Sequence, residues 1–116
     1  MDASQVIDCR VESPQGENLG KIETIVFDLS EGRILYAVLS FGGFLGTGDK
    51  LFPIPLTSLS FRTGKDGDLE RCILNVDQET LKSAPGFYRS ERSEPLDRRF
   101  LLRVYSHFGV TPYWGN

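Results

Sequence analysis

The chain has 116 residues, of which 40% are hydrophobic and 25% charged, which is the composition of a single ordinary globular domain. Neither a disordered nor a fibrous protein fits these proportions. The formal net charge of −3 opposes general nucleic-acid binding, because that binding depends on lysines and arginines that neutralise phosphates. Charge is uneven: residues 89–116 are net basic and residues 1–88 are net acidic. We expect the basic tail to fold back on the acidic part, the alternative being an anionic partner.

The first residues and the length of the apolar runs indicate where in the cell the protein is expected. Residues 1–5 contain no basic region followed by an apolar one, so we expect no secretory signal. The longest apolar run, residues 34–39, is far shorter than the about 20 residues that span a bilayer. A cytoplasmic protein is therefore expected. Cys9 and Cys72 alternate with apolar neighbours, so each is interpreted as a small buried hydrophobe, with a disulfide between them possible in principle.

Six strands are predicted in chain order from alternating and β-branched residues. They cover residues 6–11, 21–29, 33–41, 51–56, 60–63 and 69–76. Short segments rich in Gly, Pro, Ser and Asp predict tight turns at residues 13–16, 30–32 and 65–68. Six strands with such connections favour a closed or nearly closed barrel, which also protects strand edges.

The third predicted strand, residues 33–41, is apolar on both faces. Strict alternation gives two sets, Ile34, Tyr36 and Val38 on one face and Leu35, Ala37, Leu39 and Phe41 on the other. One face of a small antiparallel sheet normally meets water. We therefore expect the outer face of this strand to be covered, either by a C-terminal helix or by a second subunit.

Two helices are predicted after the strands. Asp77 caps a short helix that reaches about Ser83 and ends before Pro85. A second helix begins near Pro95, with Asp97 in its first turn and Ser93 or Glu94 before it, and ends at Gly109. Its apolar stripe consists of Leu96, Phe100, Leu101, Val104, Tyr105 and Phe108. This amphipathic helix is expected to dock on the strand at residues 33–41.

A glycine-rich loop interrupts the apolar segment at residues 41–55. Phe44 and Leu45 stand between its glycines, at an expected loop tip where polar residues are the default, so they are either shown to a partner or tucked over the barrel end. Pro53 and Pro55 lack the amide hydrogen of a central strand, so the following strand should lie at an edge or leave the sheet.

The glycine spacing does not fit a nucleotide site. In a phosphate-binding P-loop, Lys and then Ser or Thr directly follow the second glycine, whereas Gly48 is followed by Asp49 and then Lys50. Leu51 stands where the dinucleotide fingerprint has its third glycine. His107 is the only histidine and has no evident partner, so neither a metal site nor a nucleophile with its base is indicated. We expect no cofactor and no enzymatic activity.

Several spaced segments together resemble the PRC-barrel domain. They are Gly20-Lys21-Ile22, YAVLSFGG at residues 36–43, GDKLF at residues 48–52 and LKSAPGF at residues 81–87. The family is named for the cytoplasmic domain of the photosynthetic reaction centre H subunit and includes the C-terminal domain of a ribosome maturation factor. The ending at residues 105–114 is similar to that of small stand-alone bacterial members, whereas residues 88–95 depart from their aromatic, acidic linker.

The resemblance implies a mainly β fold, a small six-stranded barrel with a short helix and a C-terminal amphipathic helix. Residues 1–88 would form the barrel, and residues 89–116 a linker, helix and aromatic tail packed on the barrel or on a second subunit. It also implies a non-enzymatic docking and assembly module, which we expect to form a homodimer and to bind a protein partner. Alternatives are a sensor of a small apolar ligand and an accessory factor in RNA or ribosome maturation.

Two partner surfaces are predicted. The first is the loop from Gly43 to Lys50, and the second is the tail at residues 110–114. The candidate residues are Gly43, Phe44, Leu45, Gly46, Asp49 and Lys50 in the loop, and Tyr113 and Trp114 in the tail. Phe44 and Leu45 could instead plug the barrel, and the tail could instead be an aromatic latch packed on the barrel.

Overall fold

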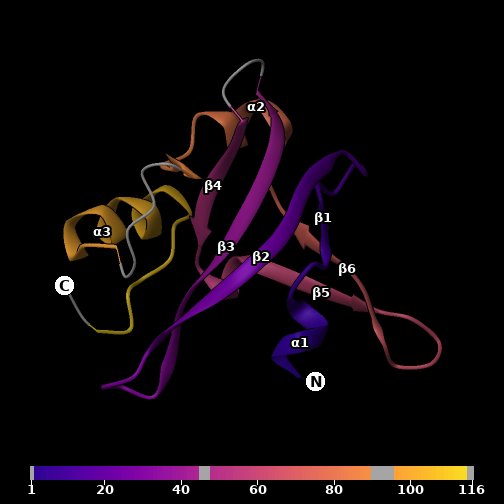
Figure 1. Cartoon of the computed structure of the whole chain (residues 1–116), viewed down its shortest axis with the longest axis horizontal. Helices are drawn as coiled ribbons and strands as arrows, with labels where there is room; N and C mark the ends of the chain where they lie inside the picture. Colours follow the sequence, from indigo (N-terminus) through magenta and orange to yellow (C-terminus); the bar gives the residue numbers. More distant parts are fainter. Residues whose placement is uncertain (1, 45–47, 90–95, 115–116) are drawn as a thin grey trace.

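The computed structural model describes residues 2–44, 48–89 and 96–114, and it is mainly β (Figure 1). In chain order the elements are α1 (Ala3–Val6), β1 (Arg10–Glu12), β2 (Asn18–Asp28), β3 (Arg33–Phe44), β4 (Gly48–Ile54), η1 (Leu56–Ser58), β5 (Leu59–Thr63), β6 (Leu69–Leu74), α2 (Gln78–Lys82), β7 (Phe87–Tyr88) and α3 (Arg98–His107). Each of the six predicted strands has a counterpart among them.

The strands form one mixed sheet in the order β5-β6-β1-β2-β3-β4-β7. β1 and β6 run parallel, and the other neighbours run antiparallel. β5 and β6 cross the direction of β3 (Figure 1), so the sheet is strongly bent, but its end strands β5 and β7 do not pair within the described residues. The expected closed, six-stranded barrel is therefore corrected to an open sheet of seven strands. The added β7 has only two residues, too few to show a sequence period.

The first predicted strand is shorter than expected. The chain forms the short helix α1 up to Val6 and enters β1 only at Arg10. Between them Asp8 has a φ of 69°, a left-handed conformation that breaks an extended strand and that aspartate tolerates better than most residues. The apolar residues at positions 6–9 therefore do not mark a strand, because Val6 reaches the core from the end of α1, and Ile7 and Cys9 reach it from the segment that follows.

A β-bulge changes the two faces of β3. Val26 pairs with Tyr36 and the next residue, Phe27, pairs with Ile34, so Leu35 is an extra residue on β3. The predicted alternation is consequently wrong at this end of the strand. Leu35 packs with Tyr36 in the outer cluster, and Ile34 turns to the opposite side.

Two hydrophobic clusters lie on opposite sides of the central strands. The inner cluster consists of Cys9, Val11, Leu19, Ile22, Ala37, Leu39, Phe41, Phe52, Ile54, Leu59, Cys72, Leu74, Leu81 and Ala84. The outer cluster consists of Leu35, Tyr36, Val38, Leu51, Phe87 and Leu101, with Val26, Leu96, Tyr113 and Trp114 packed against it. The side chain of Leu101 brings α3 into the outer cluster. The C-terminal helix α3 therefore packs on the outer face of β3 in the same chain, and whether a second subunit also meets this face stays a prediction.

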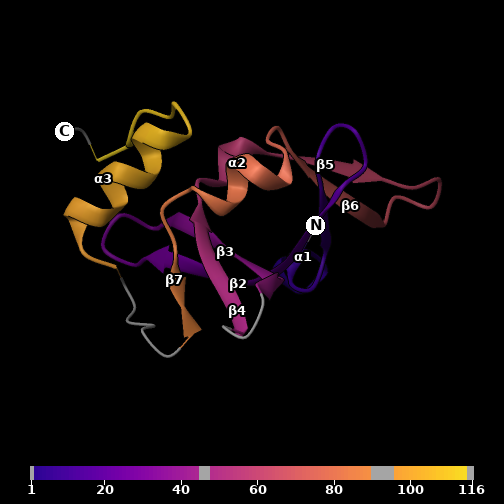
Figure 2. The same ribbon diagram turned by 90° about the horizontal axis from the view of Figure 1, so that it is seen from above.

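The start of α2 is capped as predicted, whereas α3 begins later in the sequence than predicted. The Asp77 carboxylate accepts a hydrogen bond of 2.7 Å from the Thr80 amide and caps α2 as predicted. The N-cap of α3 is Asp97, which accepts a hydrogen bond from the Phe100 amide at 2.8 Å, so Asp97 precedes the helix and does not lie in its first turn. Residues 93–95 lie outside the described residues. α3 lies beside the sheet, away from the β5–β6 hairpin (Figure 2).

Candidate functional site

The predicted loop surface is only partly within the described residues. Gly43 and Phe44 end β3, Gly48 and Asp49 begin β4, and the backbone of Phe44 pairs with that of Gly48. Leu45 and Gly46 lie outside the described residues. Whether the loop tip is exposed or plugs the fold therefore stays a prediction.

Lys50, the last residue of that candidate loop, makes contacts with other residues of the same chain. Its ammonium group donates a hydrogen bond of 3.2 Å to the carbonyl oxygen of Lys82 and lies 5.1 Å from the ring centroid of Phe52. Lys82 is the last residue of α2, where a positive charge interacts favourably with the free carbonyl groups. Lys50 thus joins β4 to the end of α2.

The tail candidates pack together against their own chain. The Tyr113 hydroxyl donates a hydrogen bond of 2.8 Å to an Asp28 carboxylate oxygen, and the Arg33 guanidinium lies 4.1 Å from the Tyr113 ring centroid. The Trp114 ring centroid lies 5.1 Å from that of Tyr113 and 5.0 Å from that of Tyr105. We call Tyr105, Tyr113 and Trp114 the aromatic latch. Its contacts are those of the latch alternative, and partner binding by Tyr113 and Trp114 stays a prediction.

The latch contacts shift the ionisation of their groups. The hydrogen bond from Tyr113, followed by that from Ser30, lowers the pKa of Asp28 because both favour the carboxylate. Burial, followed by the hydrogen bond to Asp28, raises the pKa of Tyr113 to about 12. Burial also raises the pKa of Tyr105. Over a wide pH range the latch therefore holds a neutral phenol against a carboxylate.

An apolar surface that sequence reasoning missed surrounds the turn between β2 and β3. Phe27 is 53% exposed and Leu29 is 90% exposed, although both are large apolar side chains. Phe27 also lines a hollow of about 310 Å³, together with Asp2, Ala3, Val6, Ile25, Ile34, Leu56 and Phe61, and Leu29 follows Phe27 two residues along the chain. We call Phe27, Leu29 and this hollow the hairpin patch. A large apolar residue next to a turn, Leu29, could have indicated an exposed apolar surface from the sequence. The place of Ile34 in the hollow could not, because it depends on the bulge in β3.

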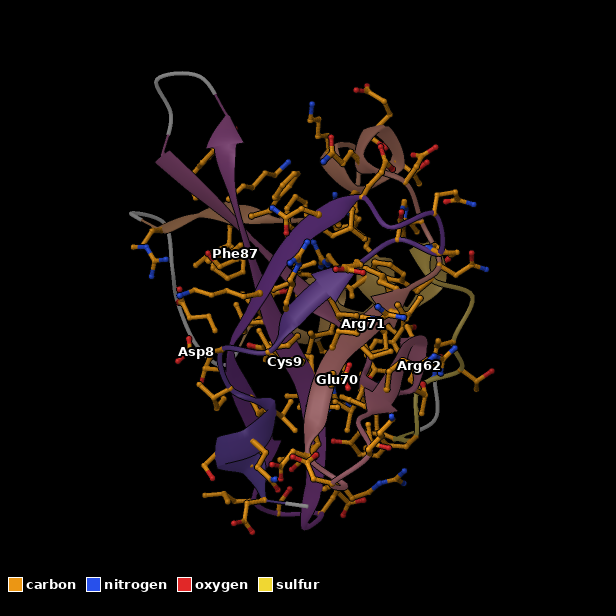
Figure 3. The ribbon with its side chains drawn as sticks, turned by 90° about the vertical axis from the view of Figure 1, so that its right-hand side faces the viewer. Asp8, Cys9, Arg62, Glu70, Arg71 and Phe87 are labelled. Atoms are coloured by element: carbon orange, nitrogen blue, oxygen red, sulfur yellow. The ribbon has the colours of Figure 1, made fainter. Side chains whose placement is uncertain are left out.

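A row of basic side chains crosses four neighbouring strands, and Figure 3 labels two of its members, Arg62 and Arg71. Arg62 on β5 pairs in register with Arg71 on β6, and Arg10 on β1 pairs with Lys21 on β2. Like charges directly opposite each other are destabilising in a sheet. We call these four residues the basic row.

Two carboxylates neutralise part of the basic row. Glu12 lies 3.0 Å from Arg10 and 3.9 Å from Arg71, and Asp8 lies 3.5 Å from Lys21. Arg62 has no ion-pair partner among residues 2–44, 48–89 and 96–114. The row therefore keeps an excess of positive charge that suits an acidic partner. Sequence reasoning missed it because the alignment depends on strand register.

The described residues contain neither a metal-binding cluster nor a membrane-spanning helix. In that part of the chain, no three His, Cys, Asp or Glu side chains gather in a way that would hold a metal ion. The same residues contain no helix of the length and apolarity needed to cross a bilayer.

Comparison with known proteins gives one result on family. The model of the PRC-barrel domain matches residues 1–70, which is more than half of the chain. The match covers the strands from β1 to β5 and the beginning of β6. No curated protein is similar enough to count as a match.

Proposed function

The chain belongs to the PRC-barrel domain family, and we propose that it is a non-enzymatic protein-interaction module that forms a homodimer and docks a protein partner. Membership of the family suggests a protein-interaction module in general. The observation that carries the homodimer is the hairpin patch, with two exposed apolar side chains, of which Phe27 lines an apolar hollow.

We propose that a second copy of the chain binds the hairpin patch. A two-fold dimer brings the same surface of both copies together, so a protruding side chain must find its receptor on the same patch. Leu29 is 90% exposed and lies two residues along the chain from Phe27, which lines the hollow. Burying each large apolar side chain would contribute about 1.5 to 3 kcal/mol.

Size-exclusion chromatography with light scattering over a range of concentrations tests the dimer. We expect the wild-type chain to dimerise and Leu29→Asp to shift the equilibrium towards monomer while the circular dichroism spectrum of the folded chain is kept, because Leu29 is exposed. Leu102→Asp is the matched control, since Leu102 on α3 is also an exposed leucine but lies outside the patch. A wild-type chain that stays monomeric at every concentration would rule out the homodimer.

The glycine loop is tested separately from the hairpin patch. We expect Phe44→Asp to leave the fold intact and to weaken self-association or partner binding, because Phe44 stands near the predicted loop tip. A thermal midpoint that collapses in this variant would identify Phe44 as a core residue and end the exposed-tip interpretation.

We propose that the partner presents an acidic segment to the basic row. The pairing of Arg62 with Arg71 supports this, because an acidic ligand would relieve the repulsion between them. NMR titration with a hexaglutamate peptide should shift amides of β5 and β6, and the shifts should weaken with added salt. Arg62→Glu should abolish the shifts, whereas Lys65→Glu in the adjacent turn should leave them. Co-sedimentation with ribosomes and no response to the peptide would favour the accessory-factor alternative.

The hollow also favours a second candidate, a sensor of a small apolar ligand. Its volume of about 310 Å³ falls at the lower end of the about 300 to 1,000 Å³ that ligand pockets occupy. Native mass spectrometry of the purified chain tests this function directly. A stably bound small molecule would support the sensor, and a chain that carries none would favour the interaction module.

A further inference from the structure

The pairing of β1 with β6 is a narrow joint in the sheet. Only two register pairs, Val11 with Cys72 and Glu12 with Ile73, connect these strands, whereas β2 and β3 share seven. In the strand order, this joint is the sheet connection between the β5–β6 hairpin and the remaining strands. A covalent link here would tie two halves of the sheet together.

Two thiols meet at this joint. The sulfur atoms of Cys9 and Cys72 lie 3.3 Å apart, and the Cys72 thiol donates a hydrogen bond to Cys9. Both cysteines are free, and both belong to the inner cluster. A disulfide bond is about 2.05 Å long, so the two sulfurs need to approach by only on the order of 1 Å. Figure 3 labels Cys9 next to β1.

We propose that Cys9 and Cys72 form an oxidisable dithiol, a modification site that closes into an intramolecular disulfide and fastens the segment before β1 to β6. This site is independent of the proposed interaction function, because it uses neither the hairpin patch nor the basic row. Reducing surroundings keep the pair as thiols, and an oxidant of the disulfide class converts it.

Accessibility decides the order of the reaction. Cys72 is fully buried, whereas Cys9 is 8% exposed and follows directly after the left-handed residue Asp8. The Cys9 amide donates a hydrogen bond of 3.0 Å to the Val6 carbonyl, at the end of the four-residue helix α1. Local opening of this short segment would expose Cys9 first. Burial raises the pKa of Cys72 to about 12, which keeps that thiol protonated until the segment opens.

The exchange balances with oxidised glutathione as the oxidant. The Cys9 thiolate attacks one glutathione sulfur, which forms a mixed disulfide and releases one glutathione thiolate. The Cys72 thiolate then attacks the Cys9 sulfur, which forms the protein disulfide and releases the second glutathione. The protein loses two protons and two electrons, and oxidised glutathione is reduced to two glutathione molecules.

The expected consequence is a more stable chain. The two cysteines are 63 positions apart in the sequence, so the disulfide would restrict a long loop of the unfolded chain. Closure of such a loop should raise the thermal midpoint by roughly 5 to 15 °C. A reductant should return the midpoint to its starting value.

The experiment incubates the reduced full-length chain with oxidised glutathione under native conditions. Intact mass spectrometry should show the loss of two hydrogen atoms, peptide mapping should find Cys9 joined to Cys72, and the thermal midpoint should rise. Cys9→Ala and Cys72→Ala are the controls, because each retains one thiol and should show neither change. The wild-type peptide map decides the case if either variant folds poorly.

Four outcomes would overturn the proposal. One is a lasting glutathione adduct on a single cysteine, and another is a disulfide between two chains on a non-reducing gel. A third is that both thiols stay free after native incubation with oxidised glutathione, although the urea-unfolded protein in the same buffer is oxidised by it. The fourth is a Cys9–Cys72 disulfide that forms without a rise in the thermal midpoint, which would refute the claim that the bond stabilises the connection of the segment before β1 to β6.

Discussion

The Tyr105 hydroxyl donates a buried hydrogen bond of 2.7 Å to the backbone carbonyl of Leu35, 70 positions away in the sequence. Leu35 is the extra residue of the bulge in β3, so α3 binds the strand at the point where its regular pairing with β2 is interrupted. This contact holds α3 at one place along the outer face of β3.

We predict that Tyr105→Phe lowers the free energy of unfolding by about 1 to 3 kcal/mol, because a buried carbonyl oxygen loses its donor. Urea denaturation followed by circular dichroism measures the change. Ser106→Ala is the control, since Ser106 is exposed on the same helix and should alter stability by less than about 0.5 kcal/mol. Equal midpoints for Tyr105→Phe and wild type would show that the hydrogen bond adds nothing.

The latch should open at both extremes of pH. The pKa of Tyr113 is raised to about 12 in the folded chain, so its contribution is complete below the unfolded pKa of about 10 and is lost as the pH rises through 12. The pKa of Asp28 is lowered, so its contribution is present above about pH 4 and is lost as the pH falls through the folded pKa. Trp114 is the only tryptophan in the chain, so its fluorescence reports both transitions.

Two variants separate the groups responsible for these transitions. Asp28→Asn should remove the acidic fluorescence transition, and Tyr113→Phe should weaken the alkaline one and leave only the part due to Tyr105. If Trp114 fluorescence stays constant between pH 10 and 12 in the wild type, the protonated Tyr113 hydroxyl is not needed to keep the aromatic latch packed.

Gly20 should not tolerate a side chain. Its φ of 107° is unfavourable for other residues, and an added Cβ would overlap the Ser40 carbonyl oxygen and lie 3.1 Å from the Phe41 Cα. We predict that Gly20→Ala costs more than about 2 kcal/mol, because the strain and the collision with backbone atoms act together. Gly32→Ala is the matched control: Gly32 has a φ of 64° but open space around it, so it should cost only about 1 kcal/mol.

Thermal unfolding of the two glycine variants measures this difference. Similar midpoints for Gly20→Ala and Gly32→Ala would mean that β2 and β3 separate readily at Gly20. That result would contradict the close approach of the Gly20 and Ser40 backbones.

Sequence patterns predicted those parts of the fold that depend on neighbouring residues. The cap at Asp77 and the end of α3 at Gly109, whose φ is 68°, follow from side-chain hydrogen bonding and from the freedom of glycine at positive φ. The bulge at Leu35 could not be predicted, because a strand's own alternation does not show where its partner skips a residue. The basic row depends on register between strands and was missed for the same reason, and the same register decides the approach of Cys9 to Cys72, which the sequence had left open as a possible disulfide.

Removal of residues 95–116 tests whether the outer cluster needs its cover. Leu101 is 2% exposed and packs with Leu35, Tyr36 and Val38 on the outer side of β3. Truncation would bring these side chains into contact with water as one continuous apolar area, which promotes association. We predict that the truncated chain is insoluble or aggregates, as measured by light scattering after purification. Removal of residues 115–116 alone is the control and should leave a well-behaved protein. A truncated chain that stays soluble and monomeric would show that β3 tolerates exposure, and the covering role of α3 would then have to be abandoned.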